Sequence, residues 1–240
     1  MVLMLSFIMA CSNAEDPKLK QSGQTQYASI RAIDCLGAIP PCPTTNDSTT
    51  MYILGCEIRG YFTYALCSGS GFHIYNVSWK MVGANCTNLE QILDDFANHG
   101  EYGTIQTIYY GIHANVVKAA ENAIFATLDR GEYGCGNDQN PVVFTSNVIA
   151  AGCLSICVEY DWEGAPIITE IECGSGCCFR VTEFCYDERG ELVLGETLYS
   201  STASCNGPVD CEAQSSPCTL NCGRITRNVL SERDFIDLTD

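Results

Sequence analysis

The pattern of hydrophobic and polar residues changes twice along this chain. Alternation with a period of two is typical of strands, whereas apolar residues at three- and four-residue steps are typical of helices. The first pattern occurs in three runs before the middle of the chain, which predict strands at 50–58, 60–67 and 71–82. Residues 35–48, which precede them, contain three prolines and the turn-forming run Asn46-Asp47-Ser48 and are expected to form a loop.

The third of these runs has the longest alternation. The residues of one parity are mainly large, and we expect them on one face of a strand: His73, Tyr75, Val77, Trp79 and Met81. Three polar residues have the other parity and are expected on the opposite face: Asn76, Ser78 and Lys80. The run therefore predicts a strand with one buried and one exposed face.

Two helices are expected in the middle of the chain. The first spans 87–98, and Thr87 and Glu90 at its start have the spacing of a capping box. The second begins at Thr104, because apolar residues then recur at helical spacing over about seven turns. Gly131, directly after a basic residue, is expected to end this helix.

Alternation returns after the helices and predicts a β-meander. Its strands are expected at 141–150, 153–160, 166–172, 177–186 and 191–199. Two tetrapeptides that end in glycine, 161–164 and 187–190, are typical of hairpin turns between strands. The whole pattern predicts an α+β fold: a disulfide-rich antiparallel β-sheet with a two-helix insertion between N-terminal strands and a C-terminal β-meander.

The N-terminus has the features of an export signal. Residues 1–10 are apolar except for one serine, and this run is shorter than the ~20 residues of a membrane-spanning helix. The sequence Ile-Met-Ala-Cys at 8–11 resembles the lipobox of bacterial lipoproteins, which implies that Cys11 becomes the lipid-modified first residue. Alternatively, the small residues at 12–14 form a cleavage site. We therefore expect a signal peptide or lipoprotein signal over 1–14, with the mature protein starting at residue 11 or 15; a buried N-terminal element with a free thiol is the remaining alternative.

The other sixteen cysteines predict a disulfide framework, because an even and dense set in an exported chain indicates disulfides. They are Cys35, Cys42, Cys56, Cys67, Cys86, Cys135, Cys153, Cys157, Cys173, Cys177, Cys178, Cys185, Cys205, Cys211, Cys218 and Cys222. Adjacent Cys177 and Cys178 are expected to bond to different partners, because neighbouring residues of a strand point to opposite faces.

The distribution of these sixteen cysteines also bears on the domain organisation. Five precede the helices and eleven follow them, so if all pair within one chain, at least one disulfide joins the two blocks. This parity argument favours a single disulfide-bonded α+β domain over 35–224, with a polar tether at 15–34 before it and a tail at 225–240 after it. The pairing itself cannot be deduced from the sequence.

No catalytic, metal-binding or cofactor motif is recognised in the chain. His73, His99 and His113 are not accompanied by a nucleophile in a known motif, and Asp94 and Asp95 are expected to be surface charge. Three cysteine pairs have C-x₃-C spacing, which permits a metal site, but an oxidising compartment favours disulfides. We therefore expect no catalytic residue, no metal ligand and no cofactor.

Charge and aromatic content narrow the range of partners. The net charge of −17 disfavours nucleic acid, and it disfavours a membrane surface unless a lipid anchor holds the protein there. One group of aromatic residues is expected mainly in the core, with any exposed members available to bind a cell-surface protein or carbohydrate. These residues are Tyr61, Phe62, Tyr64, Phe72, Tyr75, Trp79, Tyr109 and Tyr110.

Together these features predict an acidic, cysteine-rich cell-envelope protein that is extracellular, either secreted or anchored by lipid at the outer-membrane surface. Its expected role is non-enzymatic: binding, adhesion or surface display. The alternative is a structural subunit of an extracellular fibre or assembly, because sheet edges and many disulfides suit self-assembly. The second alternative is an extracellular hydrolase, because such a site needs no local sequence motif.

The N-terminus provides a first testable prediction. We expect the exported protein to begin at Cys11 and to carry acyl chains on that residue. Intact mass under reducing and non-reducing conditions reports the first residue, the lipid and the number of disulfides in one measurement. A mature protein that begins at residue 15 without acylation would contradict the lipoprotein interpretation.

Overall fold

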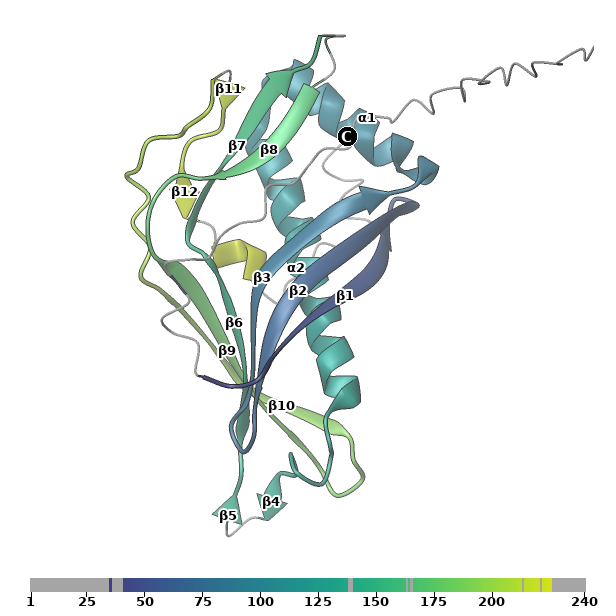
Figure 1. The fold of residues 1–240 in the computed structure, drawn as a ribbon, viewed down its shortest axis with the longest axis vertical. Helices are drawn as coiled ribbons and strands as arrows, with labels where there is room; N and C mark the ends of the chain where they lie inside the picture. The colour runs from purple at the N-terminus through teal and green to yellow at the C-terminus, as the bar shows by residue number, and fades with distance from the viewer. Residues whose placement is uncertain are drawn as a thin grey trace, which may run out of the picture.

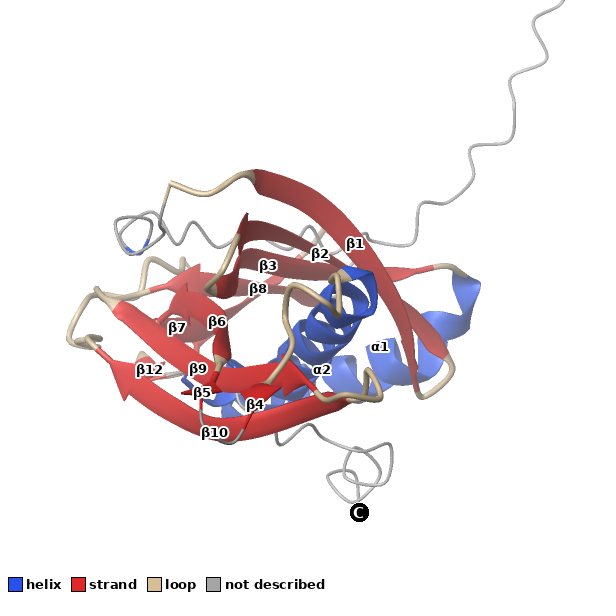
Figure 2. Ribbon diagram, turned by 90° about the horizontal axis from the view of Figure 1, so that it is seen from below, coloured by secondary structure: helices blue, strands red, loops and turns tan. Residues whose placement is uncertain are grey.

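The structure is a computed structural model that describes residues 35, 41–137, 140–162, 164, 166–212, 214–220 and 222–225. The expected signal with Cys11, the expected tether and residues 226–240 of the expected tail lie outside the described residues. The α+β class is confirmed: two helices pack against a mixed six-stranded sheet, which curves around the longer helix (Figure 1 and Figure 2). No helix in this described part of the chain is long and apolar enough to cross a membrane.

The six-stranded sheet combines strands from both halves of the chain. In spatial order it contains β1 (Thr44–Ile53), β2 (Cys56–Cys67), β3 (Gly71–Val82), β6 (Phe144–Ala151), β9 (Cys177–Tyr186) and β10 (Leu192–Ser201). All neighbours are antiparallel except β3 and β6, which run parallel, so the sheet differs from an antiparallel one at a single pairing. A parallel pair needs a crossover connection, and the two helices supply it.

The helices follow β3 through a short 3-10 turn, η2 (Ala84–Cys86). They are α1 (Thr87–Asn98) and α2 (Tyr102–Thr127). The expected capping box is wrong: Cys86 is the N-cap of α1, and the Thr87 hydroxyl donates backward to the carbonyl of Ala84 at 3.3 Å. The expected stop of the second helix is also wrong, because Leu128 is already extended, before Gly131 is reached.

The expected meander is divided between two sheets. β7 (Cys153–Tyr160) and β8 (Pro166–Glu172) continue the lines of β6 and β9 but pair in a second sheet. The chain bends between β6 and β7 at Gly152, where an added Cβ would lie 2.2 Å from the Cβ of Ala203 and 3.1 Å from the carbonyl oxygen of Gly176. The absence of a side chain at this position therefore lets two loop segments pack against the bend.

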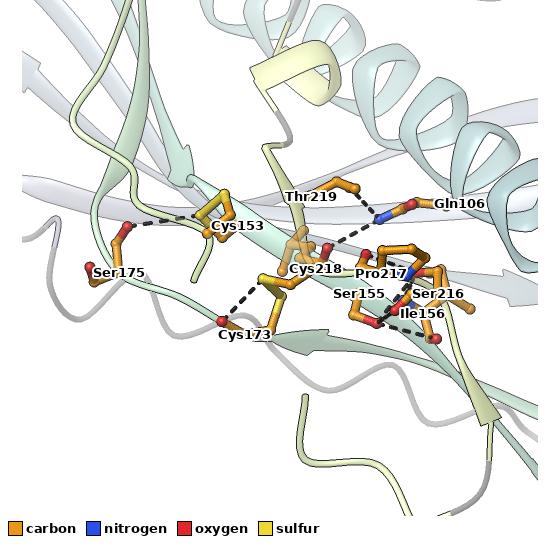
Figure 3. The surroundings of a disulfide bond; sticks show 12 residues. Gln106, Cys153, Ser155, Ile156, Cys173, Ser175, Ser216, Pro217, Cys218 and Thr219 are labelled. Atoms are coloured by element: carbon orange, nitrogen blue, oxygen red, sulfur yellow. Dashed lines mark hydrogen bonds between the residues drawn. A yellow bond between two sulfur atoms is a disulfide. The ribbon is translucent and has the colours of Figure 1, made fainter. Parts of the chain in front are cut away.

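The C-terminal segment completes the second sheet as two short strands, β11 (Gln214–Ser215) and β12 (Thr219–Leu220), which pair with β7. Figure 3 shows the polar contacts that attach it. The Gln106 amide of α2 donates to the carbonyl of Leu154 at 3.1 Å and to the Thr219 hydroxyl at 3.0 Å, and the Ser155 hydroxyl donates to the carbonyl of Ser216 at 2.6 Å. The remaining elements are a two-stranded ribbon of β4 (Gly136–Asn137) and β5 (Asn140–Pro141), and a final 3-10 turn, η3 (Cys222–Ile225).

A tight turn explains why the expected first strand is misplaced. Leu54 and Gly55, both with positive φ (51° and 80°), connect β1 to β2 inside the run that was expected to be one strand at 50–58. The first strand therefore starts earlier, at Thr44, within the expected loop at 35–48.

A bulge in β3 overturns the expected division of its two faces. Asn76 has a φ of 51°, and the register between β2 and β3 shifts there. As a result Phe72 and Ile74 share the main core with Val77 and Trp79, whereas Tyr75 packs in a second cluster on the other face of the sheet. One extra residue in a strand reverses the parity of every residue after it.

All sixteen cysteines beyond residue 30 form disulfides in the structure. The eight bonds are Cys35–Cys177, Cys42–Cys67, Cys56–Cys86, Cys135–Cys185, Cys153–Cys205, Cys157–Cys211, Cys173–Cys218 and Cys178–Cys222. Cys35–Cys177 joins the N-terminal block to the C-terminal block, as the parity of the two blocks requires. Cys177 and Cys178 bond to different partners, which confirms that prediction.

The expected aromatic group belongs mainly to the core, which confirms its packing role. Phe62, Phe72, Tyr75, Trp79 and Tyr109 are buried, and the other three members are half-buried. The rings pack edge-on: the centroids of Trp79 and Tyr109 are 5.1 Å apart at 62°. This group therefore joins α2 to β2 and β3 and does not form an exposed aromatic patch.

A buried ion pair lies between α2 and the sheet. The Arg180 guanidinium of β9 pairs with the Glu121 carboxylate of α2, and the two side chains are 0% and 1% exposed. The Ser146 hydroxyl of β6 donates to the same carboxylate at 2.7 Å, and Arg180 also donates to the carbonyl of Ile225 in η3 at 2.8 Å. One polar cluster thus connects four elements inside an apolar core.

This ion pair gives a prediction for stability. We expect Arg180→Met to lower the free energy of unfolding by about 3–5 kcal/mol, because it leaves the Glu121 carboxylate buried without its guanidinium partner. Urea unfolding with the disulfides intact measures the change. Arg189→Met, at an exposed position, is the control and should change stability by no more than about 0.5 kcal/mol. A loss below about 1 kcal/mol for Arg180→Met would show that the core tolerates the unpaired acid.

Candidate functional site

An open groove of about 840 Å³ runs along α1 at one end of the molecule, beside the β1–β2 turn. In Figure 1 this end is at the top. Helix α1 provides every lining residue except Leu54 of the turn, and the lining combines amides, carboxylates and apolar side chains. It consists of Leu54, Asn88, Gln91, Ile92, Asp94, Asp95, Phe96 and Asn98.

The sequence of α1 explains why it presents a polar face to the groove. Leu89, Leu93 and Ala97 recur every four residues and are buried, so this side of the helix faces the core. The other residues of the helix are exposed or half-buried. Ile92 and Phe96 are half-buried and pack against the edge of the core, which gives the groove an apolar component.

The turn at Leu54 is strained. Two-residue hairpin turns with positive φ at both positions favour Asn-Gly or Gly-Gly, and a leucine in this conformation costs roughly 1–2 kcal/mol. The half-buried Leu54 side chain packs against the core and lines the groove. The Cys56–Cys86 disulfide joins the first residue of β2, directly after the turn, to the N-cap residue of α1. Retained strain of this kind clusters at functional sites, which supports the groove as a binding site.

The groove has acidic character. Burial raises the pKa of the Asp94 carboxyl, and the nearby Glu90 raises this pKa further. Asp95 is exposed, and Nδ1 of His99 lies 2.8 Å from its carbonyl oxygen and 3.7 Å from its carboxylate. The residues of α1 include acids but neither lysine nor arginine, so an anionic ligand would be repelled here.

A β-hairpin meets the far end of α1. The Tyr160 hydroxyl at the end of β7 donates to the carbonyl of Ala97 at 3.4 Å, so the β7–β8 turn lies beside the Asn98 end of the groove. The turn closes as expected, with Gly164 N–H donating to the carbonyl of Asp161 at 3.0 Å. Trp162 at its tip is 90% exposed.

Sequence reasoning did not single out Trp162 or the groove. The exposure of Trp162 could have been predicted from its place inside a four-residue turn, because a turn residue lies on neither face of a strand and its large ring is not buried there. The groove has no such local signal, because Leu54 and the lining of α1 come together only through the fold. Asp94 and Asp95 do lie at the surface, but Asp94 is half-buried in the groove wall.

The three histidines lie on different elements. His113 is buried within α2, and His99 follows α1 outside the groove lining. His73 of β3 is half-buried, and burial lowers the pKa of its imidazole. Within the described residues no group of three or more His, Cys, Asp or Glu side chains is arranged to hold a metal ion.

Comparisons with known proteins identify no relative of this chain. No family model, no curated protein and no solved structure matches the chain. The groove and the chemistry of its lining therefore provide the basis for the proposed function.

Asp94 gives a prediction with a defined pH dependence. Because its folded-state pKa is raised above the ordinary value of 3.8, its ionisation costs stability. This cost is absent below pH 3.8, appears as pH rises through the folded-state pKa, and persists at neutral pH. Asp94→Asn should therefore be more stable than the natural protein at pH 7 and equal to it at pH 3, as measured by urea unfolding.

The control for this comparison is Asp210→Asn, at an exposed position in a C-terminal loop. It should leave stability unchanged at both pH values. An equal gain from Asp94→Asn at pH 3 and pH 7 would show that the effect does not come from the ionised carboxylate.

Proposed function

We propose that this protein is an extracellular, non-enzymatic binding protein that holds a neutral carbohydrate of the cell surface in the α1 groove. The observation that carries the proposal is the lining: amides and carboxylates alternate with apolar side chains along one helix. The eight disulfides are consistent with an extracellular or secreted protein. The protein would be anchored by lipid at Cys11 or released by cleavage before residue 15.

The polar part of the lining suits a ligand with many hydroxyl groups. Asn88, Gln91 and Asn98 each offer two N–H donors and an amide oxygen, and the Asp94 and Asp95 carboxylates add acceptors. A sugar hydroxyl both donates and accepts, so it can satisfy both kinds of group at once. The acids disfavour anionic saccharides, and a neutral saccharide can use their oxygens as hydrogen-bond acceptors.

The apolar part of the lining suits the C–H faces of sugar rings. Leu54, Ile92 and Phe96 add apolar side chains to the same lining, the usual combination in small-molecule sites. The exposed ring of Trp162 stands next to the Asn98 end, where it can extend contact beyond the groove.

The hydrolase alternative has less support than binding. A hydrolytic site would gather in one cavity either an accessible histidine with carboxylates or two carboxylates that face each other. The lining of the groove includes neither His99 nor His113, and its two aspartates, Asp94 and Asp95, are adjacent on one helix and point in different directions. The described geometry therefore supports holding a ligand better than cleaving one.

Glycan binding tests the proposal. A panel of neutral oligosaccharides is screened against the secreted protein, and isothermal titration calorimetry then measures Kd for the saccharides that bind. The double variant Gln91→Ala with Asn98→Ala should weaken binding by about 10- to 100-fold, because two hydrogen bonds are lost. Asn122→Ala, an exposed amide on α2, is the matched control and should bind like the natural protein.

Two results would refute the proposal. One is that no neutral saccharide binds at millimolar concentration. The other is that saccharides bind but the groove variants retain full affinity, which would place the site elsewhere.

A further inference from the structure

The side chain of Trp162 is the most exposed large hydrophobic group that the structure describes. It is 90% exposed, whereas the other tryptophan of the chain, Trp79, is 3% exposed. A ring exposed to this degree adds little packing to the fold. Tryptophan is enriched at binding surfaces, because its ring offers a large apolar face and its N–H reaches a polar partner. The surroundings of Trp162 therefore decide whether it binds a ligand.

The backbone at Trp162 is held in a closed turn. The N–H of Gly164 donates to the carbonyl of Asp161 at 3.0 Å, which makes Trp162 the second residue of a four-residue turn. Gly164 has a φ of 84°, which glycine adopts without steric cost, and the ring of Pro166 fixes the backbone at the start of β8. An indole has only two side-chain torsions to order. The turn therefore presents the ring at a low entropic cost of binding.

Two tyrosines attach this turn to one end of the α1 groove. The Tyr160 hydroxyl donates to the carbonyl of Ala97, and the next residue, Asn98, lines the groove. Tyr102, the first residue of α2, is close by: burial raises the pKa of its hydroxyl, and Tyr160 raises this pKa further. Trp162 follows Tyr160 by two residues, at most about 7 Å of chain. Figure 1 shows the tips of β7 and β8 next to α1, so the ring stands just beyond the groove.

The charges around the ring favour an uncharged partner. Residues 153–172 contain Glu159, Asp161 and Glu163 close to the turn, and they contain neither lysine nor arginine. These acids disfavour an anionic saccharide or an anionic lipid surface. The groove has the same acidic character, so one neutral ligand can lie against both.

The size of the groove indicates a ligand that is a chain. Helix α1 has 12 residues and is therefore about 18 Å long. The volume of about 840 Å³ lies in the upper part of the range of roughly 300–1,000 Å³ for small-molecule sites. A linear oligosaccharide that follows α1 would leave the groove at the Asn98 end, where it meets Trp162.

We propose that Trp162 forms a second subsite, which stacks on a sugar ring beyond the Asn98 end of the groove and makes the protein select longer linear chains. This inference rests on the carbohydrate binding proposed above and specifies the ligand further: a linear neutral oligosaccharide. Short saccharides fill the groove alone, whereas a chain that reaches the β7–β8 turn gains the contact with the indole.

A ladder of saccharide lengths tests the proposal. Isothermal titration calorimetry measures Kd for linear oligomers of two to six units of β-1,4-glucose, β-1,3-glucose and α-1,4-glucose. In a ladder that binds, we expect affinity to rise about tenfold at the length that first reaches Trp162, because stacking on an aromatic ring adds free energy to the contact. Trp162→Ala should remove this rise and leave the affinity for shorter oligomers unchanged.

Two further variants control for the loss of a large side chain. Trp162→Phe keeps an aromatic face and should retain most of the rise. Tyr199→Ala removes an exposed aromatic ring on β10, away from the groove, and should bind like the natural protein. An unchanged disulfide mass and circular dichroism spectrum confirm that the variants fold.

Tryptophan fluorescence gives a second readout. Because Trp79 is buried, a change in emission on binding reports on Trp162. The six-unit oligomer should shift the emission to shorter wavelengths, the two-unit oligomer should not, and Trp162→Phe should abolish the shift. A shift with neutral phosphatidylcholine vesicles but not with the oligomers would assign Trp162 to a membrane surface and overturn the proposal.

The groove variants separate failure of this inference from failure of the proposed function. If Gln91→Ala with Asn98→Ala weakens binding but Trp162→Ala retains the full rise with length, the subsite is refuted and the groove stands. If no ladder binds, or if the groove variants keep full affinity, the proposed function fails and the subsite fails with it.

Discussion

The pairing of Arg180 with Glu121 is the constraint on which the arrangement of helix and sheet depends. Removing a guanidinium and a carboxylate from water costs several kcal/mol for each ion, and their attraction offsets this cost only if the geometry is kept. A rotation of α2 or a one-residue slip of β9 would separate the two charges inside an apolar core. The pair therefore disfavours alternative packings of α2, and Ser146 and Ile225 extend this restriction to β6 and η3.

The disulfides fix the positions of elements that the Arg180–Glu121 ion pair does not contact. Cys56–Cys86 holds the start of α1 beside the β1–β2 turn, so the two walls of the groove are joined by a covalent bond. The other end of α1 is fixed by the short connection to α2 and by the hydrogen bond from Tyr160. A groove held in this way needs little reorganisation to bind a ligand, which favours affinity.

The sequence predicted the bounds of several strands better than it predicted which strands pair with one another. The strands at 71–82, 153–160, 166–172 and 177–186 have the expected bounds, because a run of apolar, aromatic and β-branched residues between turn residues is a local signal of a strand. The parallel pairing of β3 with β6 and the separation of β7 and β8 into a second sheet depend on contacts between distant residues, which no local pattern contains. The errors at Leu54 and Asn76 have another cause: each residue adopts a left-handed conformation inside an apolar run. The parity of the cysteines required a bond between the two blocks but could not identify Cys35 and Cys177 as its members.

The two edges of the six-stranded sheet differ in composition, and this bears on the choice between binding and assembly. The β1 edge consists mainly of threonine, serine and other polar residues, whereas β10 exposes Val193, Leu194, Leu198 and Tyr199. A fibre built by edge pairing needs both edges, because the β10 edge of one copy would have to pair with the β1 edge of the next. A polar edge is a poor template for this pairing. The α1 groove lies at the end of the molecule opposite the β9–β10 hairpin, as Figure 1 shows, so a ligand can reach it without contact with either strand of that hairpin. Binding in the groove therefore has more support than assembly through the sheet edges.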